Sequence, residues 1–379
     1  MLPYIIVFIF TPLNTYLAEK YFKKNKKSIA IFFCIIAILI PSIIAGIRHI
    51  SVGVDGEVYI EPYFNTYKSF SIFDVITQSS SFNLEILFGF ILYLGSKISS
   101  NPNIVFFIIQ LIITIVLFIT AFKTRKKLNM TMFMTVFALV IFAKGLNIMR
   151  QTIGISFFIL SLYYMFNDKR IKTITFFLIG LLFHSSVAIL GIIYLLYYIN
   201  KKTKNNKQRI IQIVLISSIT MILAMNINRI ILALAQNGII PARYYNYIQN
   251  VEAVDFNFSW LMYNGLLMCL AFLIYKKTSH KNSHLENVQN FTLFESTFIG
   301  ILLLISMLLI GNSGEIYRFS YSFMVIGIIY LFPQFYLALK KDKLNFFLGY
   351  ILMYIILFMF FYLSFIFIKQ AKIYPFIFM

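Results

Sequence analysis

Long apolar runs, repeated along the whole chain, constrain this protein more than any other feature of its sequence. A helix needs about 20 apolar residues to cross a hydrocarbon core of ~30 Å. Runs that approach or reach this length lie at 2–18, 28–47, 104–122, 148–166, 210–227, 259–275, 293–311, 319–339 and 344–368. Shorter or interrupted runs lie at 83–98, 130–143, 173–183 and 187–199. We therefore predict an all-α, polytopic integral membrane protein with roughly 11–13 transmembrane or re-entrant helices.

The composition agrees with this interpretation. Hydrophobic residues make up 60% of the chain and charged residues only 12%, about half the ~25% of a soluble domain, so a water-soluble fold is excluded. No segment is long and polar enough to be a separate soluble domain, and we expect residues 1–379 to form one polytopic domain. Cys34 and Cys269 both lie inside apolar runs, which argues against a disulfide framework or a thiolate metal site.

The net charge of +20 comes from 33 Lys and Arg against 13 Asp and Glu. In a soluble protein it would suggest a nucleic-acid partner, but in a membrane protein basic residues mark the cytoplasmic loops. Most of them fall in six short, Lys-rich loops, at 20–27, 123–127, 169–172, 201–209, 276–281 and 340–343. We therefore expect no nucleic-acid partner. The excess of Lys over Arg, together with abundant Ile, Phe and Asn, is typical of AT-rich bacterial genomes. We predict a multi-pass protein of a bacterial cytoplasmic (inner) membrane. Its remaining loops, 48–82, 144–150, the turn at His184, 228–258 and 312–318, are expected to face outward.

One segment does not fit a simple alternation of spans. Two ordinary spans at 83–98 and 104–122 would place the basic cluster 123–127 outside. Either 83–98 is re-entrant or interfacial, or 173–199 is one long span and the block 123–172 is inverted. We favour the first arrangement, because inversion would place two basic clusters outside.

Five of the eight arginines fall in the outward segments under this topology. They are Arg48, Arg150, Arg229, Arg243 and Arg318. Most of the acidic residues fall in the same segments. The outer loops therefore carry both arginines and acids, whereas the charged residues of the inner loops are mostly lysines. A cationic cavity on that side would suit a dianionic or pyrophosphate-bearing substrate. The alternative for each arginine is a side chain that snorkels to the interface without a ligand.

Two outward segments combine arginine with other polar residues. In the first, Arg48 ends a span, and Gly53 permits a turn that would bring Asp55 back toward it, with Tyr59 following. In the second, Arg150 and Gln151 stand at the outer end of the run 148–166, where an arginine deep in the bilayer would cost about 2.5–3.5 kcal/mol and so needs water or a partner.

His184 interrupts an apolar run and is followed by two serines. Ionisable groups within a membrane are costly and are functional candidates by default, and a histidine can act as a base or as a neutral hydrogen-bond donor. The alternative is a structural histidine bonded to a neighbouring helix. We expect no metal, because His49 is the only other histidine on the outer face, while His280 and His284 lie in a predicted cytoplasmic loop.

Two arginines of the C-terminal half stand beside tyrosines. Arg243 precedes Tyr244, and Tyr317 precedes Arg318. Guanidinium groups bind phosphoryl oxygens and aromatic faces stack on sugar rings, although tyrosine is also common at membrane interfaces. The sequence contains no Walker A loop, nucleotide fingerprint, zinc-protease helix or nucleophile elbow, which argues against ATP-driven transport and standard hydrolases.

At these residues the chain resembles the EpsG-like family of bacterial exopolysaccharide and capsule polymerases, related in role to Wzy-type O-antigen polymerases. The resemblance lies in Gly46-Ile47-Arg48 with Val52-Gly53-Val54-Asp55 and Tyr59, in Phe82-Asn83-Leu84-Glu85, in Asn147 with Arg150-Gln151, and in Phe183-His184-Ser185-Ser186. The chain departs from the family at Gly56, where an aromatic residue is usual, and after Glu85, where a proline and glycine pattern is missing.

The resemblance implies a membrane glycosyltransferase that joins undecaprenyl-pyrophosphate-linked repeat units at the outer leaflet, without a metal or cofactor. Its partners would be that lipid-linked glycan, membrane lipids, a chain-length regulator and a flippase. We hypothesise that Arg48, Arg150 and Arg318 bind the pyrophosphates and that His184 or Asp55 activates the acceptor hydroxyl. Further substrate contacts are expected from Gln151, Arg243, Tyr59 and Tyr317.

Two other classes of protein remain open at this point. A lipid-linked oligosaccharide flippase would also need a cationic cavity, but alternating access predicts repeated halves, and the sequence shows no internal repeat. A membrane glycan ligase or acyltransferase would use similar residues with a different acceptor.

Overall fold

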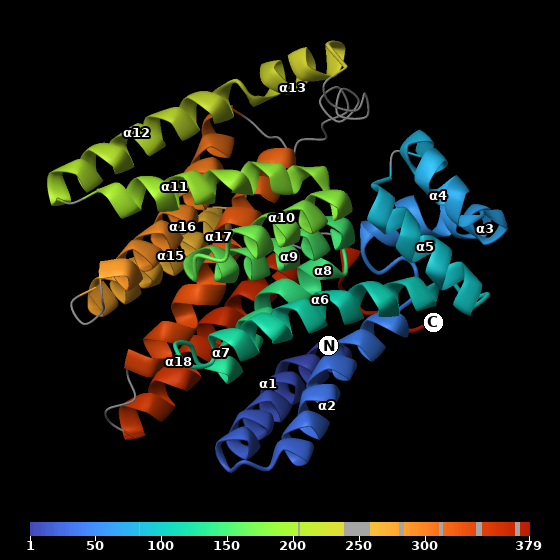
Figure 1. The fold of residues 1–379 in the computed structure, drawn as a ribbon, viewed down its shortest axis with the longest axis horizontal. Coiled ribbons are helices and arrows are strands. Elements are labelled where there is room, and N and C mark those ends of the chain that lie inside the picture. The colour runs from blue at the N-terminus through green and yellow to red at the C-terminus, as the bar shows by residue number, and fades with distance from the viewer. Residues whose placement is uncertain are drawn as a thin grey trace. The chain divides into compact units, whose positions relative to one another are not determined.

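The computed structural model describes residues 1–82, 84–203, 205–238, 258–279, 284–310, 314–338, 343–367 and 372–379. Helices dominate this part of the chain, as expected (Figure 1). The chain divides into two compact units, one of residues 1–188 and 332–379 and the other of residues 189–331. Units of packing do not define membrane domains, so the single polytopic domain stays a prediction.

The first unit contains most of the helices of the N-terminal half and α18. Its helices are α1 (Leu2–Lys23), α2 (Lys27–Gly46), α3 (Glu61–Ser69), α4 (Ile72–Gln78), α5 (Ile86–Ile98), α6 (Asn103–Thr124), α7 (Met130–Val136), α8 (Phe142–Gly145), α9 (Met149–Phe166), α10 (Arg170–Phe183) and α18 (Lys343–Phe361). A π-helical turn, Phe137–Ile141, joins α7 to α8.

The second unit contains the remaining described helices. They are α11 (Gly191–Lys202), α12 (Asn206–Met225), α13 (Ile227–Gln236), α15 (Phe258–Ser279), α16 (His284–Ile310) and α17 (Gly314–Ala338), whose last residues from Phe332 are assigned to the first unit.

Seven helices of the described residues are long and apolar enough to cross a membrane. They are Leu2–Lys23, Lys27–Gly46, Asn103–Thr124, Lys207–Met225, Leu285–Met307, Ile316–Gln334 and Phe347–Phe367. Each coincides with a span expected from the sequence, and α9 and α15 match the expected runs at 148–166 and 259–275 to within a few residues. The prediction of an all-α polytopic membrane protein is therefore confirmed.

α16 begins earlier than the expected run at 293–311, and a buried polar network surrounds Thr292 and Glu295, which follow its first turns. Asn200 of α11 donates hydrogen bonds to Thr292 (2.9 Å) and to the carboxylate of Glu295, which is fully buried. Gln212 of α12 donates to the same carboxylate at 3.0 Å. Burial of a polar group costs free energy unless the group is hydrogen-bonded, and this network provides those bonds.

α9 and α10 form an antiparallel pair that determines the geometry at the start of α9. The carbonyl of Gly180 on α10 lies against Gly154, whose missing side chain leaves room for it. Two turns further along α9, Ser161 donates a hydrogen bond to the carbonyl of Thr173, near the start of α10. Later residues of α9 therefore contact earlier residues of α10, so the two helices are antiparallel. The end of α10 consequently lies beside the start of α9.

Candidate active site

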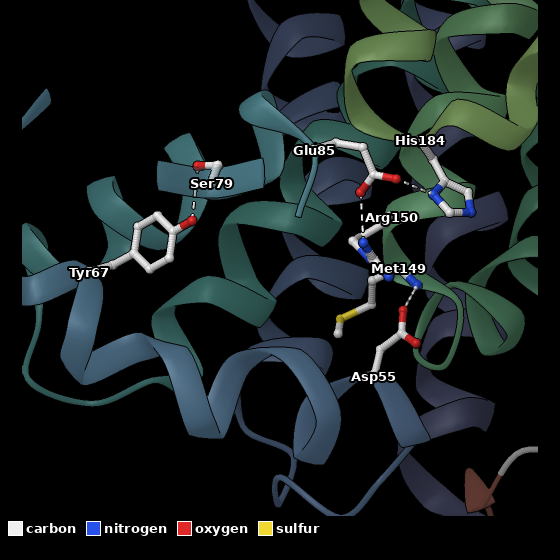
Figure 2. Close-up of polar contacts among 7 residues, drawn as sticks. All are labelled: Asp55, Tyr67, Ser79, Glu85, Met149, Arg150 and His184. Atoms are coloured by element: carbon white, nitrogen blue, oxygen red, sulfur yellow. Dashed lines mark hydrogen bonds and ion pairs between the residues drawn. The ribbon is translucent and has the colours of Figure 1, made fainter. Parts of the chain in front are cut away.

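Glu85, just before α5, joins two residues that are far from it in sequence (Figure 2). One carboxylate oxygen, Oε2, accepts a hydrogen bond from Arg150 Nη1 at 2.7 Å, and the other, Oε1, lies 2.9 Å from His184 Nδ1. The side chains of Arg150, Glu85 and His184 are 6%, 11% and 12% exposed. The three charged or ionisable groups thus form one nearly enclosed cluster, which we call the Glu85 cluster.

The antiparallel pair of α9 and α10 explains why these residues meet. Arg150 lies in the first turn of α9, and His184 follows the last residue of α10. Glu85 is held beside them by the packing of α3 and the turn at 79–82 against α5. There Tyr67 and Ser79 share a hydrogen bond of 2.9 Å (Figure 2). Both hydroxyl groups lie close to Gly89, where any side chain would collide with them.

Aromatic rings surround the guanidinium group of Arg150. Its central carbon lies 3.8 Å from the centre of the Tyr59 ring and 5.6 Å from that of Phe88. A cation above an aromatic face is attracted by the ring, more strongly where water is excluded. Arg150 is therefore held by a carboxylate and by two rings. Tyr59 packs against the Glu85 cluster, and its expected contact with substrate stays a prediction.

Asp55 caps the N-terminus of α9. Its Oδ2 accepts a hydrogen bond from the backbone N–H of Met149 at 2.9 Å (Figure 2), and Asn147 Oδ1 accepts one from the N–H of Val54 at 2.8 Å. A carboxylate at this position satisfies one of the unpaired N–H groups of the helix and interacts favourably with its dipole. These two bonds attach the segment 52–55 to the start of α9.

Gly53 makes this attachment possible. Its φ is +87°, and a Cβ added there would lie 2.2 Å from the carbonyl oxygen of Leu146. The turn that the sequence predicts at Gly53 is therefore present, and it brings the chain back toward the start of α9.

We expect Gly53→Ala to destabilise the protein by at least about 1–2 kcal/mol, because a side chain must adopt a left-handed backbone and must displace Leu146. Thermal unfolding of the purified protein in detergent would measure the loss. The matched control is Gly265→Ala in α15, where a Cβ would meet nothing within 4 Å, so that the change should be neutral or slightly stabilising. An equal loss in both variants would contradict the role of Gly53.

Arg48 is enclosed rather than open to a cavity. It is 1% exposed, its guanidinium lies 3.8 Å from the centre of the Phe106 ring, and its Nη1 donates a hydrogen bond of 2.5 Å to the carbonyl of Leu146. Burial lowers the pKa of Arg48 to about 9, against the opposing effect of Tyr4 and Asp55, so the group stays charged at neutral pH. In this conformation Arg48 fixes the segment 47–55 against α6 and residue 146.

The last eight residues of the chain pair with the same segment. The carbonyls of Ile377 and Lys372 accept hydrogen bonds from the N–H groups of His49 (2.7 Å) and Gly53 (3.0 Å), and Met379 donates to the carbonyl of Ile47 at 3.1 Å. The tail 372–379 is thus hydrogen-bonded to the segment 47–53, directly before Asp55.

We expect deletion of residues 377–379 to speed hydrogen exchange at the His49 amide by about 2- to 10-fold, since the lost hydrogen bonds contribute about 0.5–1.5 kcal/mol each. The control is Lys372→Ala, which removes only an exposed pair with Glu57 at 4.0 Å and should leave the exchange unchanged. Unchanged exchange after the deletion would show that the tail does not hold this segment.

Both ends of α5 lie at the same end of the first unit. Glu85, just before α5, contacts Arg150 and His184, and Asn103, just after it, donates hydrogen bonds to the carbonyls of Arg48 (2.7 Å) and Gly46 (3.2 Å). At 13 residues α5 spans only about 20 Å. This geometry favours the re-entrant or interfacial arrangement for 83–98, which stays a prediction.

The remaining predicted site residues are distributed differently. Gln151 is buried in the first turn of α9, next to the Glu85 cluster. Arg318 and Tyr317 are half-buried in α17, in the second unit, and Arg229 is exposed in α13. Arg243 lies outside the described residues. Glu85 was not among the predicted site residues, although it belongs to one of the recognised motifs and is an acid that directly precedes an apolar run.

No group of three His, Cys, Asp or Glu side chains that could hold a metal ion occurs within the described ranges. The Glu85 cluster pairs one carboxylate with a histidine and an arginine, a donor set suited to proton transfer and anion binding. Fold and cluster together define a multi-pass, all-helical membrane protein with an ionisable centre at one end of its helices.

The family is shown by comparison with known proteins. The model of the EpsG family matches residues 31–378, and the chain therefore belongs to the EpsG family. The matched range includes the Glu85 cluster, Arg48, Asp55 and most of the tail. Comparisons with curated proteins and with solved structures gave no match. The chain is accordingly a membrane protein of polysaccharide biosynthesis.

Proposed function

We propose that this protein is a metal-independent polysaccharide polymerase. It joins oligosaccharide repeat units carried on undecaprenyl pyrophosphate, at the outer leaflet of the bacterial cytoplasmic membrane. Family membership supports the general role, and the Glu85 carboxylate, which bridges Arg150 and His184, is the single observation that carries the chemistry. Transfer of a glycan from a lipid pyrophosphate requires a proton acceptor for the attacking hydroxyl and a fixed cation for the leaving group.

His184 is the proposed proton acceptor. Its Nδ1 lies 2.9 Å from Glu85 Oε1, and a carboxylate at that distance accepts a hydrogen bond from a protonated Nδ1. In a neutral ring this tautomer leaves Nε2 with the lone pair that can take the proton of a sugar hydroxyl. Glu85 would thus orient the base, as the third group does in other hydrogen-bonded catalytic arrangements.

Asp55 is less suited to this role. Its carboxylate already accepts the backbone N–H of Met149 and lies at the positive end of α9, an arrangement that stabilises the start of that helix. We therefore assign Asp55 to the positioning of α9 and His184 to the proton transfer.

Arg150 is the proposed cation that binds the pyrophosphate. It is paired with the Glu85 carboxylate, which also contacts His184. Arg318, with Tyr317, and Arg243 are proposed as further contacts to the lipid-linked glycan, and Gln151 and Tyr59 as contacts beside Arg150. The role proposed for Arg48 in binding pyrophosphate would require its enclosure by Phe106 and Leu146 to open. A chain-length regulator and a flippase are the proposed protein partners.

Profiling of lipid-linked glycans after deletion of the gene tests the reaction. Single repeat units should accumulate on the lipid, exposed at the outer face, and polymer should disappear. Repeat units trapped at the inner face would instead indicate a flippase. Full-length polymer left on the lipid would indicate a ligase, and either result would overturn the proposed reaction.

A further inference from the structure

A cavity lies at the lysine-rich end of the first unit. Its lining residue Tyr163 stands near the end of α9, whereas Arg150 of the Glu85 cluster stands in the first turn of that helix. It has a volume of about 510 Å³ and is lined by residues of α1, α2, α6 and α9 together with Arg125. The two cations of its lining are Lys123, in the last turn of α6, and Arg125, directly after that helix. Its eight lining residues include no acid. The cavity therefore has a net positive lining at the end of the helices where the sequence predicts the cytoplasm.

Lys123 lies near the ring of Tyr163, which also lines the cavity, and near the ring of the neighbouring Tyr164. Lys123 Nζ lies 6.0 Å and 5.6 Å from the ring centres of Tyr163 and Tyr164, and Lys172 Nζ lies 5.4 Å from the latter. Arg125 lies over the ring of Phe122 and donates a hydrogen bond to its carbonyl through Nη1. The other N–H groups of the Arg125 guanidinium remain for a ligand, since one such group carries five.

The wall of the cavity is apolar. Phe22, Phe118 and Ile119 line it together with Cys34, and Ile119 is 39% exposed on a helix long and apolar enough to cross a membrane. A small free anion has no apolar group that could contact this wall. A lipid uses both parts, because its phosphate can reach the basic rim while an acyl chain covers the apolar side chains.

We propose that this cavity binds an anionic phospholipid, with the phosphate held by Lys123 and Arg125 and one acyl chain lying along Phe22, Phe118 and Ile119. Basic pockets between membrane helices on the cytoplasmic side are suited to such head groups. The proposal does not depend on the polymerase reaction, because it uses none of the residues of the Glu85 cluster.

The test measures retention of phosphatidylglycerol by the full-length protein, purified in a neutral detergent, using native mass spectrometry. Phosphatidylcholine with the same acyl chains is the neutral comparison. We expect the double variant Lys123→Ala, Arg125→Ala to retain phosphatidylglycerol about 10- to 30-fold more weakly, the change expected from two charges at a membrane surface. The charge-matched control is Lys26→Ala, Lys27→Ala, at the same end of the helices but outside the cavity, and it should stay within about twofold of the unchanged protein.

Two further arms separate the sources of binding. Glycerol 3-phosphate should not displace the lipid at equal concentration. Ile119→Trp, which narrows the cavity along its apolar wall and keeps both cations, should weaken retention of phosphatidylglycerol. Ile119→Trp also provides the test if the double variant fails to purify in folded form. Equal loss in the cavity and control variants, displacement by glycerol 3-phosphate, or unchanged retention in Ile119→Trp would each overturn the proposal.

Discussion

Replacement of His184 by glutamine is expected to reduce polymer formation by about 10²- to 10⁴-fold, the usual contribution of a positioned general base. The glutamine amide can still donate a hydrogen bond to Glu85, which now lies 2.9 Å from the histidine ring, but it cannot accept the proton of a sugar hydroxyl. The loss should therefore appear in the chemical step while the protein remains folded. The measurement is the length and amount of polymer in cells that carry the variant, with lipid-linked repeat units quantified in parallel.

His49→Gln is the matched control for this experiment. His49 is exposed, lies in the segment after α2 that the sequence predicts to face outward, and has its Nδ1 2.8 Å from the hydroxyl of Ser51. Its replacement should therefore leave polymer unchanged. Asp55→Asn should lower polymer only modestly, because the amide oxygen can still accept the Met149 hydrogen bond. Polymer of normal length in the His184→Gln variant would refute the assignment of the base, and normal polymer in both this variant and Asp55→Asn would refute the proposed site.

The spans of this protein could be predicted closely from the sequence, because a bilayer fixes the length of an apolar helix. The exception is α16, which begins at His284 instead of near residue 293. Its polar first turns have the composition of a loop, although they are helical. Further along the helix, the buried carboxylate of Glu295 accepts hydrogen bonds from Asn200 and Gln212. Such partners come from other helices and leave no pattern along α16 itself.

The candidate site could be predicted in part. Arg150 and His184 stand out because ionisable groups in apolar runs are costly, and the antiparallel packing of α9 on α10 brings them together. Glu85 is 65 residues from Arg150 and 99 from His184 in sequence, so its place between them depends on how α5 packs. The pairing of the tail 372–379 with residues 47–53 is likewise a tertiary contact that no local pattern specifies.

Arg48 illustrates a different limit. An arginine at the end of an apolar run has the same appearance whether it snorkels, binds an anion or stacks on a buried ring. Only the positions of Phe106 and Leu146 distinguish these cases, and both are distant in sequence.

The second large effect is expected at Glu85. Its replacement by alanine would leave the guanidinium of Arg150 buried, with a side-chain exposure of 6%, and without the carboxylate that now lies 2.7 Å away. Removal of one partner of a buried ion pair costs about 3–5 kcal/mol. Asp55 also acts on Arg150, but more weakly than Glu85 does, so we expect only part of this loss to be offset. We expect Glu85→Ala to lower the unfolding temperature markedly and to abolish polymer. The control is Glu57→Ala, an exposed acid with a pair of 4.0 Å to Lys372, which should change stability by less than about 1 kcal/mol.

A double variant separates the structural effect of Glu85 from its chemical one. In Glu85→Ala, Arg150→Met both charges are absent, and the methionine can fill the space between Tyr59 and Phe88. Replacing both members of a buried pair by apolar groups is often neutral or stabilising, so the unfolding temperature should recover. Polymer should stay absent, because His184 has lost its orienting carboxylate and the pyrophosphate has lost its cation. Recovery of polymer together with stability would mean that the cluster serves only to hold α5 against α9 and α10.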